Sequence, residues 1–261
     1  MEIVKQMIQE AKLTQAIEYI EQLLRDDPLN PDLKSTLIEL LCISGEYERA
    51  DKQLNLIVQK HPDFLIGASN LRQLLRAAQS RQDSLTGQSV PKLFSEVDGH
   101  SEAFMKLRVE LNQGQPEQVS KGAIALEQAR PAIAININDQ PNQEVRDLDD
   151  TLGGFVEIFG TDGHYYIAQL SEIDYIHFKP VSSLVEQVWR RVDIAIKNGP
   201  CGEAHIPVVY ATSETDSQKL GRETDWHESA TDVMTGRGMK MWFVDNAALP
   251  LSAISKLSAA A

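Results

Sequence analysis

A repeat of 34 residues in the first third of the chain constrains the fold more than any other feature. Ile3, Leu37 and Leu71 are spaced by this step. The same step relates Met7, Leu41 and Leu75, and it pairs Leu13 with Tyr47, Ala16 with Ala50, Ile20 with Leu54, Leu23 with Ile57, and Pro28 with Pro62. A period of 34 residues with a small residue in the second helix and a terminal proline is typical of tetratricopeptide helical hairpins. The pattern therefore predicts stacked hairpins, and a generic helical bundle is the alternative.

The repeated positions have physical roles in such a hairpin. Ala16 and Ala50 allow two helices to approach closely, and Pro28 and Pro62 end the second helix of each unit. Gly45 lies between paired helices, where a helix end accommodates a left-handed residue. Residues 64–79 are expected to form the first helix of a third unit, or a cap over the open end of the stack.

A further pair of helices is predicted after a loop. Residues 80–100 collect turn-forming residues and are expected to form that loop. Gly114 to Pro131 then spans 17 residues, as Gly45 to Pro62 does, which predicts a degenerate further hairpin with Ser101 as its first N-cap. The apolar residues of its two helices are Phe104, Leu107 and Leu111, followed by Val119, Ala123 and Leu126.

From about residue 150 the pattern changes to short runs typical of β-strands. Residues 154–159 and 165–170 flank Gly160–Gly163 and predict a hairpin. Further strands are predicted at 174–178, 192–196, 206–211 and 239–244, with a short helix at 182–190 and an irregular connection at 212–238. The predicted fold class is α+β with two domains. Residues 1–148 form tetratricopeptide-like helical hairpins, and residues 149–261 form a small α+β domain with a mainly antiparallel sheet.

The balance of charges argues against two classes of partner. Acidic residues number 38 and basic residues 25, which gives a net charge of −13. Such a field repels phosphate backbones and anionic lipid headgroups, so we expect neither nucleic acid nor a membrane as a partner. The first residues lack the pattern of a secretory signal, and no apolar run approaches the ~20 residues that span a bilayer. These features predict a cytoplasmic protein, with Cys42 and Cys201 as reduced, packed thiols.

Common motifs that carry chemistry are absent from the sequence. It contains no GxxxxGK loop, no GxGxxG and no GxSxG, and its histidines and cysteines do not pair at metal-ligand spacing. We therefore expect no catalytic residues, no metal and no cofactor.

Two polar clusters leave alternatives open. Asp225–Glu228 places His227 between carboxylates, which suits acid–base catalysis, and the alternative is a polar loop anchored by one buried tryptophan. Arg146–Asp150 is rich in carboxylates but lacks the regular alternation of a calcium loop. For this segment a solvated connection between the domains is favoured over a cation site.

Stacked hairpins have a concave face that suits a peptide or a helix. Apolar positions among polar ones on this face fit the apolar side of an amphipathic helix. For Ile8, Cys42 and Ile43, burial in the core is an equally strong alternative. The groove-side residues predicted from the register are Ile8, Gln9, Ser35, Glu39, Cys42, Ile43, Ser69, Gln73 and Arg76.

An ordered series of motifs resembles a known family. One tract, residues 37–51, lies in the second repeat, and the more specific motifs are Asp147–Gly154, Val188–Arg191, Gly202–Tyr210, Leu220–Trp226 and Ala248–Leu251. Together they cover nearly the whole chain. The sequence is similar to the ImpE/SciE (TagJ) accessory proteins of bacterial type VI secretion systems.

The resemblance implies a non-enzymatic cytoplasmic protein that binds the N-terminal helix of the small contractile-sheath subunit (TssB). It also implies a link to sheath handling by the ClpV ATPase. It assigns no role to the family motif formed by Gly221, Arg222, Thr224, Asp225 and Trp226. Two alternatives from other classes stay open. They are a hydrolase-like enzyme that uses the cluster around His227, and a structural protein whose sheet domain self-assembles.

Overall fold

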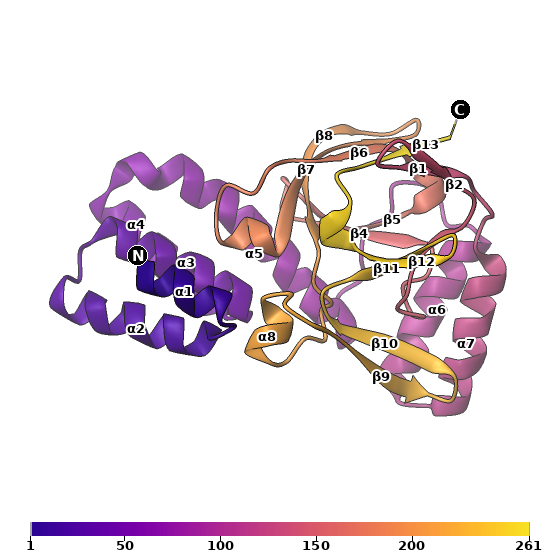
Figure 1. Cartoon of the computed structure of the whole chain (residues 1–261), viewed down its shortest axis with the longest axis horizontal. Coiled ribbons are helices and arrows are strands. Elements are labelled where there is room, and N and C mark those ends of the chain that lie inside the picture. Colours follow the sequence, from indigo (N-terminus) through magenta and orange to yellow (C-terminus); the bar gives the residue numbers. More distant parts are fainter. Residues whose placement is uncertain (1, 261) are drawn as a thin grey trace.

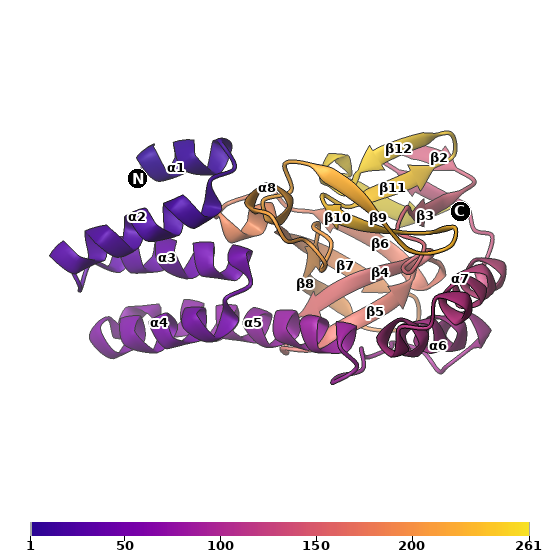
Figure 2. The same ribbon diagram turned by 90° about the horizontal axis from the view of Figure 1, so that it is seen from below.

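The first part of the chain folds into stacked helices, as the repeat predicts. A computed structural model describes residues 2–260. Figure 2 shows the first helices side by side at one end of the molecule and the strands at the other. The helices of the repeats are α1 (Glu2–Gln9), α2 (Leu13–Asp26), α3 (Pro31–Ser44), α4 (Tyr47–Lys60) and α5 (Leu65–Leu85), with the 3-10 helix η1 (Pro62–Phe64) before α5. The prediction of tetratricopeptide-like hairpins is confirmed.

The ends of these helices follow the chemistry of their residues. The Asn30 side chain accepts hydrogen bonds from the backbone N–H groups of Asp32 and Leu33, which caps α3. Gly45 ends α3 with φ of 86°, a conformation that a residue with a Cβ rarely adopts. Ala16 and Ala50 are both 0% exposed, so each lies where two helices meet closely.

Helix α5 is longer than expected and reaches the sheet. Residues 80–85, predicted to lie in a loop, continue this helix, and the loop begins at Thr86. The reason is that the last turns of α5 bury Arg81 and Ser84 against the strands. Figure 2 shows α5 running from the stacked helices to the strands.

The next two helices, α6 (Gly99–Gln113) and α7 (Pro116–Ala129), form the predicted hairpin but do not extend the stack. They lie against the strands at the far end of the molecule (Figure 2), where the Phe104 and Phe155 rings are 4.7 Å apart. The N-cap is Asp98 and not Ser101. The Asp98 carboxylate accepts the Ser101 N–H at 2.9 Å, and the Ser101 hydroxyl accepts the Asp98 N–H at 2.8 Å.

The second part of the chain is built around a mainly antiparallel sheet, as predicted. Eight strands form it in the order β2-β1-β13-β6-β7-β8-β4-β5, and every pair in it is antiparallel. Smaller sheets have the orders β12-β11-β3 and β10-β9. Figure 1 shows β9 and β10 side by side as a hairpin. The strands are β1 (Ile135–Ile137), β2 (Gln140–Asn142), β3 (Val145–Asp147), β4 (Phe155–Gly160), β5 (Tyr165–Gln169), β6 (Ile173–Phe178), β7 (Trp189–Ile196), β8 (Cys201–Pro207), β9 (Thr224–Ala230), β10 (Val233–Gly238), β11 (Met241–Val244), β12 (Ala247–Pro250) and β13 (Lys256–Ala259).

Several expected boundaries were wrong. The segment 212–238 is not irregular, because it contains α8 (Asp216–Lys219) and the hairpin of β9 and β10. Residues 182–190 hold only the 3-10 helix η3 (Val185–Gln187), and the strand expected at 206–211 is β8, which ends at Pro207. Strands β1–β3 also precede residue 149, although the domain division at 148/149 stays a prediction.

The two cysteines differ in their exposure to solvent. Cys42 is buried, and burial raises the pKa of its thiol, whereas Cys201 is exposed and not packed as expected. Both are free cysteines. Within residues 2–260, no helix is both long enough and apolar enough to cross a membrane.

Candidate functional site

The predicted groove residues fall into two groups in the structure. The two isoleucines and Cys42 are core residues, and the polar residues lie at the surface or between the two halves of the molecule. Ile8, Cys42 and Ile43 are 2%, 1% and 7% exposed. Gln9, Ser69 and Arg76 are exposed, and Ser35, Glu39 and Gln73 are half-buried.

The second half of the chain covers part of the expected groove. A carboxylate oxygen of Glu39 on α3 accepts the backbone N–H of Val185 at 3.0 Å. The Gln73 side chain lies against Gly163, where a Cβ would be 2.5 Å from Gln73 Oε1. Of the predicted residues on α5, Ser69 and Arg76 stay exposed and, seven residues apart, form a stripe along one side of the helix.

On the other face of α5, a cleft of about 350 Å³ separates α3 and α5 from strands β7 and β8. Burial lowers the pKa of His205 in this cleft to about 4, although the charge of Glu186 opposes the shift. His205 is therefore neutral near pH 7. The residues that line the cleft are Glu39, Asn70, Leu71, Leu74, Thr161, Ser183, Val185, Glu186, Arg191, Glu203 and His205.

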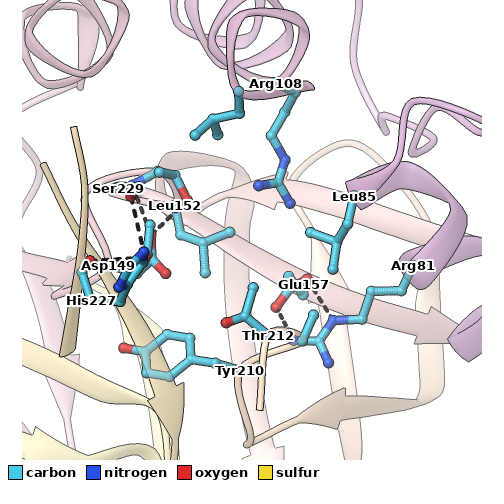
Figure 3. A pocket seen from close by; sticks show the side chains of 14 residues that line it. Arg81, Leu85, Arg108, Asp149, Leu152, Glu157, Tyr210, Thr212, His227 and Ser229 are labelled. Atoms are coloured by element: carbon cyan, nitrogen blue, oxygen red, sulfur yellow. Dashed lines mark hydrogen bonds and ion pairs between the residues drawn. The ribbon is translucent and has the colours of Figure 1, made fainter. Parts of the chain in front are cut away.

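A buried ion pair joins α5 to the sheet. Arg81 is 6% exposed and Glu157 on β4 is 3% exposed. The Arg81 guanidinium donates to both carboxylate oxygens of Glu157, at 2.7 and 2.6 Å (Figure 3), and to the carbonyl oxygen of Val209 at 2.9 Å. Such two-fold pairing fixes orientation as well as distance. It holds the last turns of the repeat helices in one position on the strands.

The same network continues into the sheet. Lys240 Nζ lies 2.8 Å from Glu157 Oε2 and 3.3 Å from Asp147 Oδ2. The Tyr210 hydroxyl donates to Asp147 Oδ1 at 2.7 Å, and the Tyr165 hydroxyl donates to Glu157 Oε1 at 2.7 Å. Arg81 and Lys240 thus balance Glu157 and Asp147 in charge, and all four side chains are buried.

Asp149 is a third buried carboxylate in this region. It accepts hydrogen bonds from the Thr151 N–H and hydroxyl at 2.8 and 2.6 Å, and from the Gly236 N–H at 2.9 Å. Burial, together with the charge of Asp147, raises the pKa of Asp149 to about 6. The expected solvated segment at 146–150 is therefore wrong for Asp147 and Asp149, which are 1% and 5% exposed.

This shift predicts a pH-dependent stability. The pKa of Asp149 is raised from 3.8 to about 6, so the folded protein binds the proton of this carboxyl more tightly than the unfolded chain does. The resulting contribution to the free energy of unfolding is complete below about pH 4 and is lost as the pH rises through 6. The loss amounts to about 3 kcal/mol. Asp149→Asn does not titrate, so its cost in free energy of unfolding is expected to be larger at low pH than near neutrality by up to this amount. Urea unfolding of both proteins at a series of pH values measures the difference. A difference that stays constant with pH contradicts the prediction.

A cavity of about 240 Å³ opens beside this network, between the end of α5, α6 and the β9–β10 hairpin. Figure 3 shows its lining, with Arg108 and Leu85 on one side and Leu152, Asp149 and His227 on the other. Its full lining is Arg81, Leu85, Arg108, Leu111, Asp149, Thr151, Leu152, Glu157, Tyr210, Ala211, Thr212, His227, Ser229 and Thr235.

His227 lines this cavity without the partner that catalysis needs. It lies in strand β9 rather than in the expected polar loop, and it is exposed. Among residues 2–260, no carboxylate forms a hydrogen bond or ion pair with its imidazole. A general base requires an orienting contact of this kind, so the arrangement does not favour acid–base chemistry at His227.

The motif at residues 221–226 makes contacts that place the β9–β10 hairpin. The Thr224 hydroxyl donates to the carbonyl oxygen of Met239 at 2.8 Å, and the half-buried Trp226 ring meets Tyr210 edge-on at 6.0 Å. Gly221 follows α8, the Asp225 carboxylate accepts the Trp226 N–H at 3.0 Å, and Arg222 is exposed. These contacts give the motif a structural explanation in this fold.

Sequence reasoning missed the residues of the buried network. Arg81, Asp147, Glu157 and Lys240 are far apart in the chain, and no spacing rule connects them. The one available signal was the charged Lys240 within a run of apolar residues, Met239–Phe243. A buried lysine requires a partner, so that position pointed to an unseen carboxylate.

Comparisons with known proteins agree with both halves of the structure. Residues 139–258 match the family model described as ImpE protein, and residues 7–77 match a tetratricopeptide repeat model. The chain is 23% identical to the type VI secretion system accessory component TagJ of Pseudomonas aeruginosa, with 93% of this chain and 86% of that protein covered. It also resembles the crystal structure of protein VPA1032 from Vibrio parahaemolyticus, with a TM-score of 0.94, 38% identity, and coverage of 99% and 97% of the two chains.

Proposed function

Because the chain belongs to the ImpE family, we propose that it is a non-enzymatic accessory protein of a type VI secretion system. In this proposal it works in the cytoplasm and binds the N-terminal helix of the small contractile-sheath subunit (TssB). Through the sheath it is linked to handling by the ClpV ATPase. The observation that carries the proposal is the likeness to TagJ, itself named an accessory component, over 93% of the chain.

The helical hairpins support a protein as the partner. Stacked hairpins of this kind offer an elongated surface that suits an amphipathic helix. Because the second half of the chain covers α3, we place the partner helix on the exposed stripe of α5, formed by Ser69 and Arg76.

The non-enzymatic part of the proposal rests on the geometry around His227. Its imidazole has no orienting carboxylate among the described residues, and Asp147 and Glu157 are committed to Lys240 and Arg81. These two carboxylates are thus held in ion pairs, which favours binding over catalysis.

Titration calorimetry with a synthetic peptide of the TssB N-terminal helix tests the proposal. We expect a one-to-one complex with a micromolar Kd, or about −8 kcal/mol. A peptide of the same composition in scrambled order is the control. Light scattering on the same sample tests the self-assembly alternative. Self-assembly would raise the particle mass as the protein concentration rises, and we expect no such increase. Absence of heat at several temperatures, with a folded protein, contradicts TssB binding.

The position of the partner helix is tested by a charge-matched pair of variants. Ser69→Glu with Arg76→Glu places carboxylates in the stripe, where the partner would have to bury them, and is expected to weaken binding at least about tenfold. Gln22→Glu with Arg25→Glu makes the same change in charge on exposed positions of α2 and should leave the Kd unchanged. Equal binding by both double variants contradicts the placement on α5.

A further inference from the structure

The cavity beside the buried network contains one cation without a partner. Arg108 extends from α6 toward the interior of this cavity (Figure 3). Its guanidinium lies 5.5 Å from the centroid of the Phe104 ring, and within residues 2–260 no carboxylate pairs with it. Arginine in a cavity is usually held by an acceptor, because each guanidinium offers five donors in a fixed plane.

Among residues 2–260, Arg81 and Lys240 are balanced by Glu157 and Asp147, whereas Asp149 has no cationic partner. Arg81 is committed to Glu157 through two hydrogen bonds, and Lys240 bridges Glu157 and Asp147 behind the cavity wall. Asp149 already accepts three hydrogen bonds from protein donors. Arg108 is therefore the group that an incoming anion can meet, and the exposed His227 adds a ring nitrogen at the same cavity.

The apolar part of the lining restricts what kind of anion fits. Leu85, Leu111 and Leu152 line the cavity together with Arg108, and Figure 3 shows Leu85 and Leu152 turned toward the same space as the guanidinium. A ligand with a hydrocarbon portion buries apolar surface against these leucines. A phosphate has no such portion, and its second negative charge would face Glu157 and Asp149.

We propose that this cavity is a binding site for a small organic monocarboxylate, in which Arg108 holds the carboxylate and the three leucines contact the hydrocarbon part. The volume of about 240 Å³ suits a small ligand of this kind. Neither Ser69 nor Arg76 lines the site, and it shares no lining residue with the cleft between α3, α5 and the strands, so it is independent of the proposed sheath binding.

Ligand-observed saturation-transfer NMR with isocaproate tests the site on the full chain. Isocaproate combines one carboxylate with a branched hydrocarbon, and its neutral amide, isocaproamide, is the matched probe without the charge. We expect isocaproate to bind with a millimolar or lower Kd and isocaproamide at least about tenfold more weakly. If inorganic phosphate displaces isocaproate with an affinity equal to that of isocaproate, the assignment to an organic acid is overturned.

Variants of Arg108 connect the binding to the residue. Arg108→Gln removes the charge of a half-buried side chain whose one recorded contact is the Phe104 ring, so the fold is expected to persist. This variant should weaken isocaproate binding at least about tenfold and abolish the preference for isocaproate over isocaproamide. Arg108→Lys should retain part of that preference. Arg25→Gln on α2 is the control and should bind as the unaltered protein does. Unchanged isocaproate binding in folded Arg108→Gln, or none in the unaltered protein, overturns the proposal.

Discussion

Glu157→Gln is expected to lower the free energy of unfolding by about 3–5 kcal/mol, because it leaves buried charges without their partner. Arg81 and Lys240 both contact the Glu157 carboxylate, and both are less than a tenth exposed. Glutamine has nearly the same shape, so the loss comes from charge rather than from a cavity. The Tyr165 hydroxyl also loses an ionised acceptor at 2.7 Å.

Urea unfolding of the full chain, followed by circular dichroism, measures this loss. Glu117→Gln is the matched control, because Glu117 is exposed and pairs with Lys121 within α7 at 2.7 Å. An exposed pair of this kind contributes little, so the control should stay close to the unaltered protein. If Glu157→Gln were as stable as Glu117→Gln, the buried network would not be holding α5 on the strands.

Gly238→Ala is expected to destabilise the protein by about 3 kcal/mol, through backbone strain and steric overlap. Gly238 ends strand β10 with φ of 85°, and a Cβ there would lie 2.0 Å from the carbonyl oxygen of Glu223. The obstructing atom belongs to the backbone of the residue just before β9, so no side-chain rotation relieves the overlap. The β9–β10 hairpin would have to shift, and with it the cavity wall that contains Thr235.

The control for this variant is Gly67→Ala on α5. No atom lies within 4 Å of the added Cβ there, and alanine favours a helix more than glycine does. Gly67→Ala should therefore keep or slightly raise the midpoint of urea unfolding, while Gly238→Ala lowers it. Equal midpoints for the two variants contradict the steric argument.

The repeat helices were predictable because their signal is local and recurs. A 34-residue step repeats the same apolar, alanine and proline positions, and α1–α5 follow it. The hairpin of β9 and β10 was not predicted, because its burial does not alternate clearly. In β9 the residues from Thr224 to Glu228 are exposed or half-buried, so their polar sequence resembled a loop. What makes them a strand is pairing with β10, a long-range effect that single-sequence patterns do not contain.

The site was less predictable than the fold. The run Met239–Phe243 was predicted to alternate between buried and less buried residues. It does, but the buried residues are Lys240 and Trp242, while the methionines are half-buried. Burial of Lys240 depends on Glu157 and Asp147, which reach it only after the sheet has formed. The groove was predicted from helical register alone, and register does not reveal that η3 would lie over Glu39.

The length of α5 has a consequence for how proteins of this shape can vary over evolutionary time. Its 21 residues span about 30 Å and serve both as the last helix of the stack and as a support of the sheet. A solenoid with two free ends can gain or lose units at either one. Here the Arg81–Glu157 pair attaches the α5 end of the stack to the sheet. A hairpin inserted between α5 and the sheet would separate the guanidinium from its carboxylate. The stack can gain units and keep that pair only at the α1 end. Added units there would lengthen the surface that contacts a partner and leave the sheet domain unchanged.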